Sequence, residues 1–295
     1  MRYASAALVT SAVLLTACSS GGHTSVSTPT TADSTIARPF DVFVPKSYDS
    51  SVAAPLVVSL HGYGSTGAIH ESYFKLQPLA EERGFLYVHP DGTKNERGEQ
   101  FWNATDACCG GPSAVIDDSA YLTELIESVQ ENYNVDPKRI YVMGHSNGGF
   151  MSYRMACDHA EQIAAIASLA GATFADTQQC KPSETVSVLQ IHGTDDQAID
   201  YDGFLSVERN YPGAKTTTAT WAAYDGCGAT PDVSTTKIDL EPTIPGAETT
   251  VAAFPDCPTG SAVELWTIDG GSHGPTVTRA FMSRVIDFLY SHPKP

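Results

Sequence analysis

The feature that most constrains this chain is a serine set between glycines, where a predicted strand gives way to a predicted helix. The apolar run IYVM at 140–143 is followed by GHSNGG at 144–149 and then by apolar residues at helical spacing. So sharp a turn forces strained backbone angles on Ser146 and leaves no room for side chains at Gly144 and Gly148. The strain exposes the Ser146 hydroxyl beside the positive end of the following helix. This context predicts a catalytic nucleophile rather than an incidental serine in a glycine-rich turn.

Short β-branched runs alternate along the chain with longer amphipathic segments. This alternation predicts an α/β protein with a mostly parallel central sheet and helices on both faces. Helices are expected over 117–133 and 277–290, where apolar residues recur at helical spacing. Residues 229–258 are polar and rich in proline, and we expect them to form an excursion from the domain. Strands are expected at 40–44, 56–60, 85–89, 140–143, 163–169, 186–191 and 262–268.

A serine hydroxyl is a weak nucleophile unless a base takes its proton, and in folds with this turn an acid and then a histidine follow the serine. Of the nine histidines, only His273 and His292 follow the last plausible acid site. His292 lies beyond the last predicted helix, whereas His273 lies in a glycine-rich loop before it, so His273 is the expected base. Asp195 and Asp196 both follow the predicted strand at 186–191, and either carboxylate is placed to accept the Nδ1 proton of His273.

A carbonyl carbon attacked by Ser146 develops negative charge on its oxygen, which two backbone N–H groups are needed to hold. Asn147, the residue after the nucleophile, is expected to supply one. The loop HGYG at 61–64 is expected to supply the other from Tyr63, because two glycines flank this residue and let the backbone approach a substrate. The aspartates near Asp196 lack calcium-loop spacing, so no metal is expected, and this chemistry requires no cofactor. The other histidines near strand ends are expected to be structural: His61, His89, His145 and His192.

Six motifs carry a family resemblance: LHGYG at 60–64, YVHPDGT at 87–93, FWN at 101–103, IDDSAYL at 116–122, VDPKRIYVMGHSNGG at 135–149 and IHGTDDQAIDY at 191–201. Together they resemble the bacterial polyhydroxybutyrate depolymerase and feruloyl esterase group of α/β-hydrolases, of carbohydrate esterase family 1 type. The resemblance implies the α/β-hydrolase fold and serine esterase chemistry, and it is less specific for the substrate. Because the family reads HGTxD, it selects Asp196 as the acid. The family also has a tryptophan shortly after the histidine, whereas Gly274 and Pro275 follow His273, which implies a wider or different cleft.

The resemblance implies a further role for Trp102. In the family, an aromatic side chain from the FWN region lies near the cleft, where a flat ring can stack on a sugar or an aromatic acyl group. Trp102 is therefore a candidate substrate-binding residue. Packing in the core is the alternative, because large aromatic side chains most often serve packing.

The N-terminus is typical of an exported, lipid-anchored protein. Arg2 precedes an apolar stretch at 6–15, which is too short to span a bilayer. LTAC at 15–18 resembles the bacterial lipobox, in which the peptide is cut before the cysteine and Cys18 is acylated. A plain secretory signal cut elsewhere is the alternative. The expected divisions are a signal peptide at 1–17, a flexible tether rich in Ser, Thr and Gly at 18–35, and one catalytic domain at 36–295.

Cysteine usage agrees with export. Of seven cysteines, six remain once Cys18 is lipidated, and an even number in an exported protein indicates disulfides. Nearness along the chain favours two pairs, Cys157 with Cys180 and Cys227 with Cys257. The adjacent Cys108 and Cys109 then either join each other or bond elsewhere. Zinc binding is the competing interpretation, and the usual paired spacing is lacking.

Charge narrows the choice of partners. The formal net charge of -17 repels phosphate backbones and anionic lipid headgroups, so nucleic-acid binding is not expected and contact with a membrane is expected only through the lipid. We also expect the protein to be a monomer. The predicted function is an exported serine esterase acting through an acyl-enzyme, on feruloyl or acetyl esters of polysaccharides or on short polyhydroxyalkanoate esters. The alternatives are a serine peptidase, because a triad does not distinguish amides from esters, and a non-catalytic binding module.

Overall fold

The computed structural model of the 295-residue chain describes residues 23–26, 38–110, 116–206 and 209–295. The predicted signal peptide, Cys18 and most of the predicted tether lie outside these residues. Within the described ranges, no helix combines the length and the apolar character needed to cross a bilayer.

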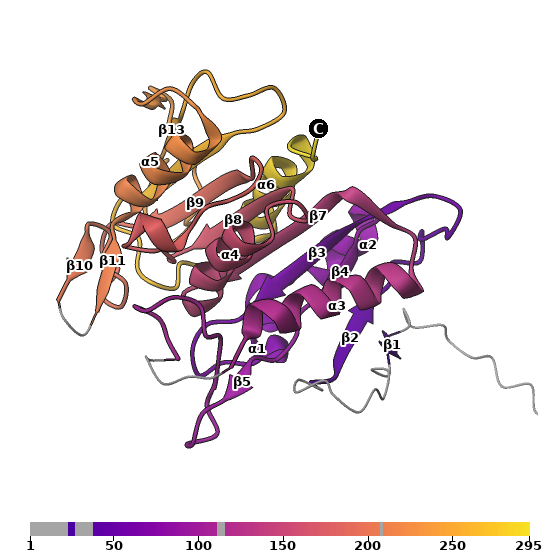
Figure 1. Ribbon diagram of the computed structural model, residues 1–295. Coiled ribbons are helices and arrows are strands. Elements are labelled where there is room, and N and C mark those ends of the chain that lie inside the picture. Colours follow the sequence, from indigo (N-terminus) through magenta and orange to yellow (C-terminus); the bar gives the residue numbers. More distant parts are fainter. Residues whose placement is uncertain (1–22, 27–37, 111–115, 207–208) are drawn as a thin grey trace, which may run out of the picture.

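A large twisted sheet forms the centre of the protein, and its middle strands, from β4 to β14, run parallel (Figure 1). All seven residues of β3 are buried, as expected of a strand covered on both faces. The outer strands on either side run antiparallel to their neighbours. In spatial order the strands are β1 (His23–Val26), β2 (Phe40–Phe43), β4 (Leu86–Val88), β3 (Ala54–Leu60), β7 (Val135–His145), β8 (Ala165–Leu169), β9 (Ser187–Gly193), β14 (Val263–Ile268), β13 (Thr249–Ala253) and β12 (Asp232–Val233).

Helices cover both faces of this sheet (Figure 1). Alternate residues of β3 enter two separate apolar cores, with Val58 on one face and Val57 on the other. The Val58 core includes side chains of α3 (Asp118–Asn132), α4 (Asn147–Asp158) and α5 (Ala214–Asp225). The Val57 core includes those of α1 (Gly67–Phe74), α2 (Gln77–Arg83) and α6 (Arg279–Ser291). The predicted α/β class, with a mostly parallel sheet between helical layers, is therefore confirmed.

The structure corrects the prediction at both edges of the sheet. Residues 23–26, expected to lie in an unstructured tether, form β1 and pair antiparallel with β2. An edge strand leaves one row of backbone N–H and C=O groups unpaired, and a neighbouring segment can hydrogen-bond to them whatever its own sequence pattern. At the other edge, the predicted excursion at 229–258 contributes β12 and β13 to the sheet.

Two short hairpins lie outside the central sheet. One pairs β5 (Thr93–Lys94) with β6 (Gln100–Phe101), and the other pairs β10 (Gly203–Leu205) with β11 (Asn210–Pro212). The first precedes the segment that holds Trp102, and the second follows the segment that holds Asp196. Both hairpins therefore stand next to the loops from which the sequence predicts the active site.

The six cysteines of the described residues form three disulfides. Cys157 pairs with Cys180 and Cys227 with Cys257, which are the pairs that nearness along the chain favours. Cys108 and Cys109 join each other, which resolves the alternative that the sequence left open. The Cys157–Cys180 bond ties the end of α4 to the segment after β8, and the Cys227–Cys257 bond ties the end of α5 to the segment after β13.

Asp225, at the end of α5, is a buried carboxyl group that titrates unusually. Its Oδ1 accepts the Val186 N–H at 3.3 Å, and its side chain is almost fully buried. Burial raises the pKa of Asp225 from 3.8 to about 7, although the Val186 N–H and the charge of Lys294 act in the opposite direction. Between about pH 4 and 7 the folded protein therefore keeps a proton on this group, which the unfolded chain has already lost.

We predict that Asp225→Asn changes the pH dependence of stability. Below pH 3.8 Asp225 is protonated in the folded and unfolded states, and between about pH 4 and 7 only the unfolded chain ionises, so the wild type loses stability as pH rises. Relative to wild type, the free energy of unfolding of the variant should rise across this window by at most about 1.4 kcal/mol per pH unit. Urea denaturation on both sides of the window measures this, and a difference that does not change with pH would contradict the assignment.

Candidate active site

The turn after β7 has the geometry that its sequence predicts. Ser146 takes φ 55° and ψ -120° immediately before the first residue of α4, a conformation that residues with a side chain rarely adopt. Its N–H donates to the carbonyl of Leu169, the last residue of β8, at 2.8 Å. A Cβ at Gly144 would lie 2.3 Å from the Gly148 carbonyl oxygen, so the turn closes only with glycine there. The hydroxyl of Ser146 is thus carried at the N-terminus of a helix and at the carboxyl edge of the sheet.

The loops after β9 and β14 bring an aspartate and a histidine together at the same edge. The Nδ1 of His273 donates to Oδ2 of Asp196 at 2.8 Å. Asp196 is buried, whereas Asp195 is exposed, so the geometry selects Asp196 from the two candidates. Because the carboxylate holds the proton on Nδ1, the Nε2 of His273 is free of a proton and is the basic nitrogen.

The buried carboxylate of Asp196 is held by several donors. Its Oδ1 accepts the N–H groups of Ala198 at 2.8 Å and Ile199 at 2.9 Å, and the Nε2 of His192 lies 3.2 Å from Oδ2. Burial alone raises the pKa of Asp196, but the hydrogen bonds from His192, His273 and the Ile199 N–H outweigh it and lower the pKa below the ordinary 3.8. Asp196 is therefore ionised throughout the neutral range.

His145, within the GxSxG motif, orients the base. Its Nε2 donates to the backbone carbonyl of His273 at 2.8 Å, and the two rings lie 4.8 Å apart. Burial, together with the charge of His273, lowers the pKa of His145 to about 4, so its ring is neutral at pH 7. The loop that holds His273 is thereby fixed to the turn that holds Ser146. Nothing in the sequence pattern singles out this role, because the x position of the motif varies in chemistry.

The two expected oxyanion donors flank the nucleophile. Gly62 lies against Ser146, since a Cβ on Gly62 would come 3.4 Å from the Ser146 Cβ. The next residue, Tyr63, turns its side chain outward, where its hydroxyl bonds to Asn95 at 2.8 Å and to Glu99 at 3.1 Å. Asn147 is the first residue of α4, and the first N–H groups of a helix have no acceptor within it. The backbone N–H groups of Tyr63 and Asn147 thus belong to the segments on either side of Ser146.

Trp102 is not a substrate-stacking residue in this structure, so that expectation is wrong and the packing alternative holds. Its side chain is fully buried, and its Nε1 donates to the His61 carbonyl at 3.0 Å. The ring lies 5.1 Å from the His61 ring and 5.6 Å from the Arg38 guanidinium carbon. A tryptophan satisfies its indole N–H when buried, and here a backbone carbonyl inside the protein fills that need.

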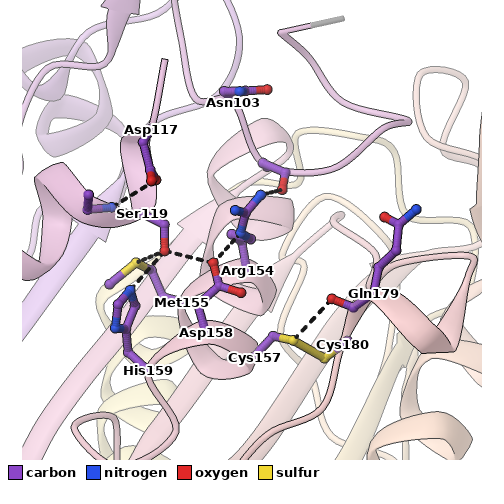
Figure 2. A network of polar contacts seen from close by, with 12 residues as sticks. Asn103, Asp117, Ser119, Arg154, Met155, Cys157, Asp158, His159, Gln179 and Cys180 are labelled. Carbon is purple, nitrogen blue, oxygen red and sulfur yellow. Dashed lines mark hydrogen bonds and ion pairs between the residues drawn. A yellow bond between two sulfur atoms is a disulfide. The ribbon is translucent and has the colours of Figure 1, made fainter. Parts of the chain in front are cut away.

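A second cluster of serine, histidine and aspartate has a different character (Figure 2). The hydroxyl of Ser119 in α3 donates to Asp158 at 2.9 Å and lies 2.9 Å from Nε2 of His159. Because the hydroxyl gives its one proton to Asp158, His159 must donate to Ser119 and does not act as its base. Arg154 also binds Asp158, and Ser119 itself is buried. The cluster fastens α3 to the end of α4 and is not a second catalytic centre.

The arrangement at the carboxyl edge provides the groups that acyl transfer needs. It brings a serine hydroxyl on a strained turn, a histidine bonded to a buried carboxylate, and the backbone N–H groups of a helix start to one edge of the sheet. In the part of the chain that the structure describes, no group of three or more His, Cys, Asp and Glu side chains is arranged to hold a metal ion.

A serine on a strand-to-helix turn, followed along the chain by an aspartate and a histidine that bond to each other, defines the serine hydrolases of the α/β-hydrolase class. The chain belongs to the phospholipase/carboxylesterase family, whose model matches residues 47–211.

Individual relatives agree with this assignment. Feruloyl esterase B of Piromyces equi is 31% identical over 237 residues, which are 78% of this chain and 41% of that protein. Poly(3-hydroxyalkanoate) depolymerase C of Paucimonas lemoignei is 28% identical over 121 residues, covering 41% of this chain and 28% of the depolymerase. The structure of an acetyl xylan esterase from Aspergillus awamori superposes with a TM-score of 0.63 at 16% identity, over 92% of this chain and 100% of that one. The chain thus spans less than half of the length of these two sequence relatives, and the structural likeness concerns the fold.

We predict that Asp196→Asn lowers the rate of p-nitrophenyl butyrate hydrolysis by roughly 10³- to 10⁴-fold, as loss of the carboxylate does in serine proteases, because the His273 tautomer is no longer held. The neighbouring Asp195→Asn serves as the matched control. Since Asp195 is exposed and outside the pair, its variant should stay within about twofold of wild type. Steady-state rates of the two folded variants decide the matter, and equal losses would rule out Asp196 as the specific acid.

Proposed function

We propose that this protein is an exported serine esterase that hydrolyses carboxylic esters through an acyl-enzyme. The hydrogen bond between Asp196 and His273, in a loop that His145 ties to the turn of Ser146, is the observation that carries the proposal. Membership of the phospholipase/carboxylesterase family supports it. In this mechanism His273 takes the proton of Ser146 as the hydroxyl attacks the ester carbonyl, and the N–H groups of Tyr63 and Asn147 hold the oxyanion. His273 then protonates the leaving alcohol, and water releases the acid by the same steps.

Hydrolysis by the Ser146→Ala variant and by wild type tests the proposal. We expect wild type to hydrolyse p-nitrophenyl acetate and butyrate, and Ser146→Ala to lose at least about a thousandfold in rate, because only a residual background remains without the nucleophile. Mass spectrometry should find a fluorophosphonate attached to Ser146. A Ser146→Ala variant that retains wild-type activity would rule out the mechanism.

Two other functions remain as outcomes of the same assay. A serine peptidase would cleave a matched amide in preference to its ester, because a triad acts on both. A binding module would be folded yet inactive towards every ester and amide tested. Side-by-side rates on one ester and its amide analogue separate these outcomes from the esterase.

We propose esters carried on polysaccharides, such as feruloyl or acetyl esters, as the substrates. A cavity of about 340 Å³ supports this choice, because Asp106, Asp176, Gln179 and Asn210 line it together with Phe174. Amide and carboxylate groups beside one aromatic ring suit the hydroxyl groups and the apolar face of a sugar. A larger and more apolar cavity of about 570 Å³ lies over β13 and β14. None of the described lining residues of either cavity belongs to the catalytic set, so the choice rests on the polar lining of the smaller cavity.

Thr105 gives this cavity a specific feature. Thr105 lines the cavity, and its buried hydroxyl has no hydrogen-bond partner among the described residues. A buried polar group without a partner costs free energy. Because the Thr105 oxygen is shielded from solvent, a sugar hydroxyl would bond to it, and relieve this cost, after a local shift of the segment at 105–107. The backbone N–H of Thr105 donates to the Cys108 carbonyl at 2.7 Å, and the Asn147 side-chain amide contacts Cys108 Sγ at 3.4 Å. The wall of the cavity is thereby connected to the residue after the nucleophile.

We predict that Thr105→Val lowers kcat/KM on a feruloylated or acetylated xylo-oligosaccharide by roughly three- to tenfold, which is the effect of one hydrogen bond. It should leave kcat/KM on methyl ferulate unchanged, because that ester has no sugar. Thr220→Val, on the exposed side of α5, is the control. Equal effects of Thr105→Val on the oligosaccharide ester and on methyl ferulate would contradict the sugar site. If wild type hydrolyses a soluble hydroxybutyrate oligomer faster than both of these esters, the result would favour the polyester class that the name of the Paucimonas relative indicates.

We propose further that the protein is exported and lipidated at Cys18. The sequence LTAC at 15–18 supports the proposal, and three disulfides in the described residues fit an oxidising compartment. In a bacterial host given labelled palmitate, the wild type should carry label and sediment with membranes. Cys18→Ser should lose both properties while the esterase assay is unchanged, and a labelled Cys18→Ser protein would exclude this site.

A further inference from the structure

A buried chain of hydrogen bonds connects the two expected oxyanion donors to each other. The backbone N–H of Trp102 donates to Oδ1 of Asn147 at 2.7 Å, and Nδ2 of Asn147 donates back to the Trp102 carbonyl at 2.8 Å. Both residues are fully buried. Asn147 follows Ser146 and begins α4, so this pair of bonds holds the start of the helix against the segment after β6.

The same tryptophan continues the chain to the second donor. Its indole N–H donates to the His61 carbonyl at 3.0 Å, at the start of the loop that contains Tyr63. The His61 ring accepts the Gly92 N–H on Nε2 at 2.9 Å, so its proton is on Nδ1, which donates to the Gly62 carbonyl at 2.7 Å. Burial lowers the pKa of His61, which agrees with this neutral ring.

The bond to the Gly62 carbonyl decides where the Tyr63 N–H points. These two groups belong to one planar trans peptide, so they face opposite ways. The Ser65 N–H also donates to the Gly62 carbonyl, at 3.1 Å. Two donors therefore fix the direction of this carbonyl, and with it the opposite direction of the Tyr63 N–H.

Close packing between the helix and the loop sets their separation. A Cβ added to Gly148 would lie 2.0 Å from the Leu60 carbonyl oxygen and 2.8 Å from that of His61. Since the backbones touch at this glycine, the helix start and the loop cannot come closer, and the hydrogen bonds described above keep them from moving apart. Distance is set by Gly148 and orientation by the hydrogen-bonded side chains.

We infer that the side chains of Asn147, Trp102 and His61 form one positioning unit that aligns the N–H groups of Tyr63 and Asn147 for the oxyanion. The inference rests on the proposed serine esterase mechanism. The three side chains do not touch the substrate. Their effect is on the transition state, because the oxyanion forms only there, and therefore on kcat more than on KM.

Trp102→Phe is the sharpest test, because it keeps a large ring and removes the indole N–H that bonds to His61. We expect kcat for p-nitrophenyl butyrate to fall by about ten- to a hundredfold, less than loss of a whole oxyanion donor, with KM within about threefold of wild type. The inhibition constant of an alkyl boronic acid, which forms an anionic adduct on the serine, should rise in parallel with the loss of kcat/KM. Asn147→Asp, which sets a carboxylate oxygen against the Trp102 carbonyl, should act in the same direction.

Trp221→Phe is the matched control. Trp221 is also fully buried, and its indole N–H donates to Thr173 at 3.0 Å, away from the oxyanion donors. It should lose comparable stability in urea while keeping kcat and boronic acid binding. If Asn147→Asp does not fold, Trp102→Phe alone carries the test.

The outcomes distinguish failure of the positioning unit from failure of the proposed serine esterase mechanism. An inactive Ser146→Ala variant together with wild-type kcat in Trp102→Phe would overturn the positioning unit and leave the serine mechanism standing. Equal kinetic losses in Trp102→Phe and Trp221→Phe would also overturn it, because they would reflect general destabilisation. An active Ser146→Ala variant would instead remove the mechanism on which the inference rests.

Discussion

The site depends on one backbone constraint, the positive-φ conformation of Ser146 between β7 and α4. Such a conformation costs on the order of 1–3 kcal/mol and persists only where the surrounding structure imposes it. Here β3 and β8 flank β7 in the sheet, and the Ser146 N–H is bonded to β8. The missing side chain of Gly148 brings the backbone of α4 against the end of β3. The conformation of Ser146 is therefore maintained by β3 and β8, two strands whose residues are all buried.

A second constraint is the burial of a negative charge. An ionised carboxylate without partners is too costly to bury, and Asp196 is stable there because backbone N–H groups and two histidines surround it. One of these, His192, does not contribute a base. Its Nδ1 accepts from Gln190 at 3.1 Å, which leaves its Nε2 proton for Asp196 and for the Ile199 carbonyl at 2.9 Å. The position of the His273 ring thus depends on the buried polar network of Asp196, His192 and Gln190 as well as on the loop that carries His273.

Sequence reasoning was strongest where a local pattern and the fold require the same thing. The parallel strands are short apolar runs because both of their faces are covered, and Ser146 and His273 follow from a turn motif and its chain order. It failed where structure is set by distant contacts. Helix α5 (Ala214–Asp225) is rich in threonine and lacks a strong apolar stripe, and only its packing on β9 and β14 makes it a helix.

The same division applies within the site. Asp195 and Asp196 are equivalent in a local pattern, and only the position of His273 separates them. The role of Trp102 was misjudged because a motif does not indicate which side of a loop its ring faces. His145 and His192 are bonded to partners far along the chain, so their functions emerge only in three dimensions.

The position of β14 has a consequence for when activity can arise. This strand lies between β9 and β13, although it is the last strand in the sequence, and His273 follows it. The hydrogen-bond partner of His273, Asp196, lies 77 residues earlier in the chain. During synthesis Ser146 and Asp196 therefore emerge well before His273, and the bond between Asp196 and His273 can form only after β14 has paired with β9. Long-range pairings of this kind form slowly, so we expect the contact between Asp196 and His273 to be among the last to form as the chain folds.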